Sequence, residues 1–204
     1  MIDIGTDKLS DCLTEFATIE VTDFESNKKV YAVHKMILAN VSGFFDAMFY
    51  GAGVFMAEGQ TGDYQFQETT HDAFALLIEF CYKQELDEDE FSVDTLIHLG
   101  ILAERILAPK LRNEVLRKIE SRCDDSLPSS QVIDLVFSDD YRDSCVRKLL
   151  AEYFALTQNL DVGDPQLPKA LLSEVLVVAK DILKKKGGKF SNQRVNKYLV
   201  DEET

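Results

Sequence analysis

The fold of this chain depends on one stretch, HKMILANVSGFFDAMF, which occupies residues 34–49. A strand that ends at Val33 passes the chain directly into a helix at His34. Ser42 is well suited to cap a second short helix, because a serine hydroxyl can accept from the first backbone N–H groups. The apolar side chains that follow His34 are adjacent or three to four residues apart, so they can point into one core. We expect this of Ile37, Leu38, Phe45 and Met48.

The residues before this stretch have the pattern of a β-hairpin. Apolar and polar residues alternate between 17 and 23, which is the period of a half-buried strand. Residues 29–33 are the expected partner strand, and the turn-forming residues 25–28 connect the two. A third short strand is predicted at residues 64–66.

Helical spacing dominates the next part of the chain. Thr70 and Ser92 are each followed by apolar residues at helical intervals, so we expect them to cap two helices. Pro109 is expected at the first position of a third helix. These elements predict an α/β domain over residues 1–123, with helix pairs over a small sheet.

A polar segment that contains a proline, residues 124–130, is the best candidate for a domain boundary. Beyond it the pattern is helical only, so residues 124–204 are predicted to be an all-α extension. Two helical stripes are expected there. They comprise Tyr141, Cys145, Leu149 and Tyr153 in the first and Leu172, Val175, Ala179 and Ile182 in the second.

The charge of the chain argues against two classes of partner. Its 204 residues include 22 Lys and Arg and 36 Asp and Glu, which gives a formal net charge of −14. Such a charge repels phosphate backbones and anionic lipid, so we expect no nucleic-acid partner and no membrane partner. The lysine-rich segment 184–197 could be a local nucleic-acid or nuclear-import segment, but a solvated helix end is the favoured interpretation.

Two features of the sequence predict where the protein acts. No window approaches the roughly 18 consecutive apolar residues that span a bilayer. Residues 1–7 lack a basic region followed by an apolar stretch. We therefore expect an intracellular protein, in the cytoplasm, the nucleus or both.

Residues that could support catalysis are few. The cysteines are far apart, without the close pairs of a zinc or redox site, and the histidines lie in no nucleophile or metal motif. The glycines of residues 51–62 lack the lysine of a phosphate-binding loop. We therefore expect no enzyme, no metal and no cofactor. The residues concerned are Cys12, Cys81, Cys123, Cys145, His34, His71 and His98.

Residues 34–49 closely resemble the signature of BTB/POZ domains, in which His-Lys, an aliphatic pair, a serine and a phenylalanine recur at this spacing. The resemblance covers roughly residues 16–122, and residues 55–86 are most similar to BTB proteins of filamentous fungi. It implies an α/β BTB/POZ fold, a helical cluster flanked by a short-stranded sheet, followed by an all-α helical extension. It also implies a domain that usually homodimerises and often recruits another protein.

The region also suggests which side chains bind a partner. Phe44, Phe49 and Phe55 are more aromatic residues than so short a region needs for its own core, so a second chain or a partner is expected to cover them. In one branch of the family a hydrophobic residue, any residue and a glutamate bind the cullin scaffold of ubiquitin ligases. Met56 and Glu58 fit that pattern. Homodimerisation with recruitment of a partner is thus the main hypothesis, a cullin adaptor is the first alternative, and an enzyme with an unrecognised site between two helical halves is the second.

Overall fold

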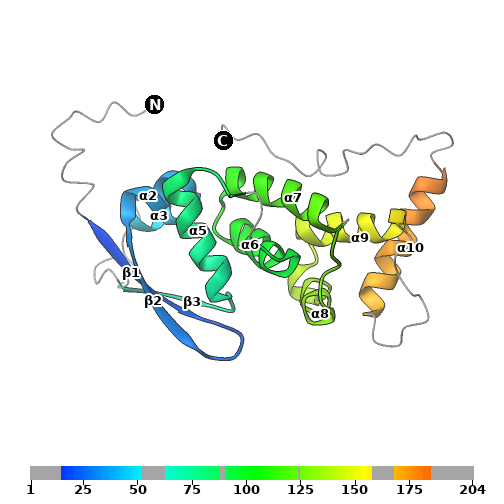
Figure 1. Ribbon diagram of the computed structural model, residues 1–204, viewed down its shortest axis with the longest axis horizontal. Helices are drawn as coiled ribbons and strands as arrows, with labels where there is room; N and C mark the ends of the chain where they lie inside the picture. Colours follow the sequence, from blue (N-terminus) through cyan, green and yellow to red (C-terminus); the bar gives the residue numbers. More distant parts are fainter. Residues whose placement is uncertain (1–14, 52–62, 88–90, 124, 158–167, 185–204) are drawn as a thin grey trace. The chain divides into compact units, whose positions relative to one another are not determined.

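The computed structural model describes residues 15–51, 63–87, 91–123, 125–157 and 168–184 (Figure 1). The elements in chain order are β1 (Phe16–Thr22), β2 (Lys28–His34), α2 (Lys35–Val41), α3 (Gly43–Tyr50), β3 (Asp63–Gln67), α5 (His71–Lys83), α6 (Val93–Arg105), α7 (Pro109–Cys123), α8 (Ser130–Val136), η1 (Asp139–Tyr141), α9 (Cys145–Thr157) and α10 (Lys169–Lys184). The fold is therefore a small α/β part followed by further helices, as the sequence predicted. No helix within the described residues is long and apolar enough to cross a membrane.

The chain forms two compact units. The first comprises residues 1–90 and 102–112, and the second comprises residues 91–101 and 113–204. Helices α6 and α7 therefore each contribute residues to both units. The domain boundary at residues 123 and 124 remains a prediction from the sequence.

A three-stranded sheet forms one side of the first unit, with the strand order β2-β1-β3. Strands β1 and β2 are antiparallel, and β1 and β3 are parallel, so that Ile19 lies opposite Tyr31 on one side and Tyr64 on the other. The predicted hairpin and the predicted third strand are both confirmed. The hairpin turn is held by the Asp23 carboxylate, which accepts from the backbone N–H of Asn27 at 2.8 Å.

The core of the first unit lies between the sheet and α5. Along β1 the inward side chains of Ala17, Ile19 and Val21 are fully buried, whereas the alternating side chains face outward. Helix α5 packs on β1 and buries Phe74 and Phe80. The predicted N-cap is confirmed, since the hydroxyl oxygen of Thr70 accepts from the backbone N–H of the third helical residue.

Ser42 joins the start of α3 to a distant turn. Its hydroxyl oxygen accepts from the backbone N–H of Phe45 at 3.2 Å, which is the predicted cap. The same hydroxyl donates to the backbone carbonyl of Ile106, in the turn between α6 and α7. One residue further on, the N–H of Gly43 donates to the carbonyl of Leu107 at 3.1 Å. Ser42 is buried, so bulk water cannot replace these hydrogen bonds if they are lost.

The second unit contains α8, α9 and α10, and α10 packs against α9 (Figure 1). Of these three helices α9 is the most buried, because it contributes Val146, Arg147, Leu149, Leu150, Ala151, Tyr153 and Phe154 to the interior. One predicted stripe is partly wrong: Tyr141 lies in η1 and not in α9. The reason is a new cap, since the Ser144 hydroxyl accepts from the N–H groups of Val146 and Arg147 and starts α9 at Cys145.

The role of Ser42 predicts a stability defect. Replacing Ser42 with Ala removes the α3 cap and leaves the Ile106 carbonyl without its hydroxyl donor. We expect the free energy of unfolding to fall by about 1–3 kcal/mol, the usual cost of a lost cap together with an unsatisfied buried acceptor. Urea unfolding of both proteins measures this loss. Ser121→Ala is the control, because the exposed Ser121 hydroxyl bonds only within its own helix, and an equal loss in both variants would contradict the assigned role.

Candidate interaction site

Helix α3 carries a cluster of aromatic side chains that continues into β3. We define the aromatic cluster as Phe44, Phe45, Phe49, Tyr64 and Phe66. Phe45 is fully buried at its centre, whereas Phe44 and Phe49 on either side of it are half-buried. The two rings that the sequence assigned to a partner therefore lie at the margin of the core.

The geometry of the aromatic cluster is that of packed rings. The Phe45 ring stacks on Phe49 at a centroid distance of 5.6 Å and lies 5.5 Å from Phe66 of β3. The Phe44 ring meets Phe66 edge to face at 5.9 Å, and Phe49 meets Tyr64 edge to face at 5.3 Å. Both arrangements are favourable for aromatic pairs, by about 0.5–1.5 kcal/mol beyond their buried area. The cluster is therefore a rigid support for the parts of Phe44 and Phe49 that remain accessible.

The structure brings together two of the five predicted binding residues. Phe44 and Phe49 lie on α3, in the aromatic cluster. Phe55, Met56 and Glu58 lie outside the described residues. Their predicted roles in binding a partner and a cullin remain predictions.

Arg105 extends the aromatic cluster with a charge. Its guanidinium lies over the Phe66 ring, 5.3 Å from the centroid, and its Nη1 donates to the backbone carbonyl of Gln67 at 2.7 Å. A guanidinium over an aromatic face is attracted by the ring quadrupole. Arg105 thereby ties the end of α6 to the end of β3 within the first unit.

Two large exposed side chains flank α3, and the sequence analysis assigned neither of them. Leu107, whose carbonyl caps the start of α3, is 64% exposed, and Tyr50 is exposed at the other end. Leu107 adopts a positive φ of 54°, a conformation that is uncommon for a residue with a branched apolar side chain. Only the adjacent Ala108-Pro109, which predicts an interruption of the helices, signals this turn in the sequence.

A second group of rings lies where β1 begins and β2 ends. His34 stands between Phe16, with ring centroids 4.1 Å apart, and Tyr82 of α5. The Tyr82 hydroxyl and the His34 Nδ1 form a hydrogen bond of 2.6 Å. This bond joins the end of β2 to α5. Both Phe16 and Tyr82 are exposed, so this group is also accessible to a partner.

Three further titratable side chains pack within the fold, those of His71, His98 and Cys81. The Nε2 of His71 lies 3.2 Å from the carbonyl oxygen of Val21, in a partly buried contact. Burial lowers the pKa of His98 below its usual range and raises the pKa of the Cys81 thiol to about 12. Among the residues that the structure describes, no three or more His, Cys, Asp and Glu side chains gather as a metal site.

Comparison with known proteins gives one positive finding. The family model described as BTB/POZ domain matches residues 10–118 of the chain, which is more than half of its length. The match includes both the aromatic cluster on α3 and the turn that caps this helix. No curated protein matches the chain.

The pKa of Cys81 leads to a test of its chemistry. Because the thiolate is the reactive form, a thiol with a pKa of about 12 stays protonated and unreactive at pH 8–9. We expect N-ethylmaleimide to label the half-buried Cys145 in the folded chain well before it labels Cys81. In denaturant both should react rapidly. Peptide mass mapping measures the two rates, and equal labelling of the folded protein would show that Cys81 is not shielded.

Proposed function

Since the chain belongs to the BTB/POZ domain family, we propose that it homodimerises and recruits another protein through its first unit. Its fold is a BTB domain with a small sheet and helices, followed by a helical extension. BTB/POZ domains generally mediate protein–protein interaction and are not typically catalytic. Homodimerisation and the recruitment of a particular partner are proposals that go beyond this general role.

The observation that carries this proposal is the incomplete burial of the aromatic cluster. Phe44 and Phe49 are held rigidly against Phe45, yet both stay half-buried. An aromatic side chain that is already immobilised loses little conformational entropy when a partner covers it. Large rings of this kind supply much of the binding energy at protein interfaces. Leu107 and Tyr50 add exposed apolar surface at the two ends of α3.

Self-association can be tested on the whole chain. We expect sedimentation equilibrium at tens of micromolar to give twice the mass of one chain, 23.1 kDa. Phe44→Ala should weaken the dimer at least about tenfold, because truncation of a central interface aromatic commonly costs 2 kcal/mol or more. Phe24→Ala is the matched control, since this exposed ring lies in the β1–β2 turn. A monomeric wild-type chain would refute the dimer, and a cooperative thermal transition shows that the variants are folded.

A cullin scaffold is the second candidate partner. It is favoured by the sequence Met56-Ala57-Glu58, which fits the hydrophobic residue, any residue and glutamate of cullin-binding relatives. In this alternative the protein is a substrate adaptor of a ubiquitin ligase, and Phe55 adds to the contact. The helical extension would then supply further contact surface.

The cullin contact can be separated from self-association. Glu58→Ala should reduce capture of a purified cullin scaffold at least about tenfold, since loss of a hydrogen-bonded charge at an interface typically costs 2 kcal/mol or more, while the dimer persists. Glu85→Ala serves as the control, because Glu85 is an exposed carboxylate outside the pattern. Equal capture of the wild type and both variants would refute a role for Glu58, and absence of capture by the wild type would refute the adaptor.

Two finer predictions rest on the sequence alone. The similarity of residues 55–86 to BTB proteins of filamentous fungi is one of them. The other is the alternative that the protein is an enzyme, which would require a reaction centre. Neither the sequence motifs nor the described residues give a reason to propose one.

A further inference from the structure

Part of the apolar surface of helix α10 is exposed. Its sequence, KALLSEVLVVAKDILK, is amphipathic with a broad apolar face, and such a face is normally covered by neighbouring elements. Of its side chains described through Asp181, only Leu171 is fully buried. Leu176 and Val177 are 58% and 59% exposed. The described part of α10 is therefore less buried than α9.

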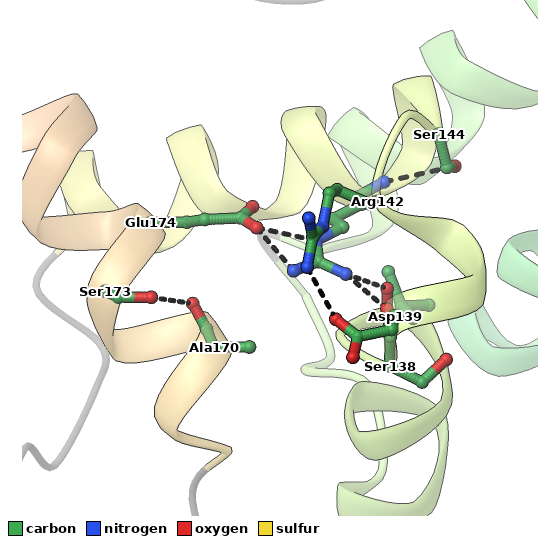
Figure 2. A network of polar contacts seen from close by, with 9 residues as sticks. Ser138, Asp139, Arg142, Ser144, Ala170, Ser173 and Glu174 are labelled. Carbon is green, nitrogen blue, oxygen red and sulfur yellow. Dashed lines mark hydrogen bonds and ion pairs between the residues drawn. The ribbon is translucent and has the colours of Figure 1, made fainter.

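An ion pair links α10 to α9 within the second unit. Arg147 of α9 is only 3% exposed, and its Nη1 donates to the backbone carbonyls of Ser138 and Val136. Its guanidinium also lies 5.1 Å from the centroid of the Phe137 ring. The Nε donates to Oε1 of Glu174 at 2.7 Å, and Figure 2 shows Glu174 reaching from α10 into this polar network.

The two side chains of the ion pair differ in how deeply they are buried. The Arg147 side chain is buried beside Phe137 and the carbonyls of Val136 and Ser138, whereas the Glu174 side chain is 32% exposed. A guanidinium at such a depth is costly unless a carboxylate and further acceptors compensate it. The carbonyls of Ser138 and Val136 are neutral, so the compensating charge in the structure comes from Glu174. Without Glu174 this position on α9 would attract another carboxylate.

We propose that α10 is a displaceable cover, and that the α9 surface beneath it, centred on Arg147, docks an amphipathic partner helix that carries a carboxylate. On α10 the buried Leu171 precedes Glu174 by three residues, so both lie on the same face of the helix. A partner helix with an aliphatic residue and a glutamate at this spacing presents the same two groups to Arg147 and its surroundings. In the structure α10 occupies this surface and therefore inhibits docking. The proposal does not depend on self-association of the first unit.

Hydrogen exchange of the full chain tests whether α10 opens by itself. We expect α10 amides to exchange faster than those of α9, because α10 detaches without unfolding of α8 and α9. Glu174→Gln should accelerate exchange in α10 by about tenfold or more, the scale expected for a hydrogen bond to a charged group, and leave α9 unchanged. Equal exchange of α9 and α10 in the wild type, or equal acceleration of both, would overturn the proposal.

The neighbouring ion pair of Arg142 and Asp139 provides a matched control. Both of its side chains are exposed, and exposed pairs contribute little to stability (Figure 2). Asp139→Asn should therefore leave exchange in α9 and α10 as it is in the wild type. An acceleration as large as that of Glu174→Gln would show that any charge lost in this region loosens α10, which contradicts a specific role for Arg147.

A synthetic peptide tests docking in trans. The probe is a fluorescent peptide of residues 168–184, added to the full chain that carries Glu174→Gln. We expect this peptide to bind at least about tenfold more tightly than the same peptide with Glu174→Gln, for the same reason. The wild-type chain should bind it more weakly than the variant chain, because its own α10 competes. Equal affinity of the two peptides, or no binding of either, would overturn the docking surface.

Discussion

The first unit depends on hydrogen bonds between the start of α3 and the turn that follows α6. A helix begins with backbone N–H groups that have no partner inside the helix, and here they lie at a buried serine. The N–H groups of Gly43 and Phe44 donate to the carbonyls of Leu107 and Ile106, and the Ser42 hydroxyl adds a further bond to Ile106. These bonds join segments that are more than sixty residues apart in sequence, since Ser42 and Ile106 are separated by 64. They determine how α3 is positioned in its unit.

The position of α3 in turn decides which aromatic side chains stay accessible. Phe45 points into the core, where Phe66 of β3 packs against it, and the two neighbouring rings Phe44 and Phe49 lie beside this pair. Arg105, at the end of α6, lies over the Phe66 ring from the same turn region that caps α3. The cap and the aromatic cluster are thus parts of one arrangement. This rigidity suits a family whose domains generally mediate protein–protein interaction.

In the second unit a charged side chain, that of Arg147, is buried. Arg147 of α9 donates hydrogen bonds to the end of α8, to the turn at Ser138 and to Glu174 of α10. Replacing such a residue with an apolar one is often neutral or stabilising for folded proteins, so a buried arginine by itself is weak evidence for a stabilising role. Its effect here is to link α9 to α10 through the Glu174 carboxylate. Helix α10 has fewer buried apolar side chains than α9 among the residues that the structure describes.

Much of the local structure could be predicted from the sequence, because its causes lie within a few residues. Alternation predicted β1 and β2, and serine or threonine before apolar spacing predicted the caps at Ser42, Thr70 and Ser92. The stripe that included Tyr141 failed because Ser144 offers a competing cap, which the spacing of apolar residues does not reveal. Of the candidate binding site, the sequence identified Phe44 and Phe49 from their density alone.

From the sequence alone, the resemblance of residues 34–49 to BTB/POZ domains indicated the fold class. Periodicity and capping act locally, so they indicated the order of most elements. Only the tertiary structure decided that Leu107 adopts a left-handed conformation and caps α3, that Phe44 and Phe49 stay half-buried, and that Glu174 compensates Arg147. The physical reason is that burial and the choice of a hydrogen-bond partner depend on residues far away along the chain. Glu174 lies 27 residues from Arg147, a distance over which residue types alone specify no contact.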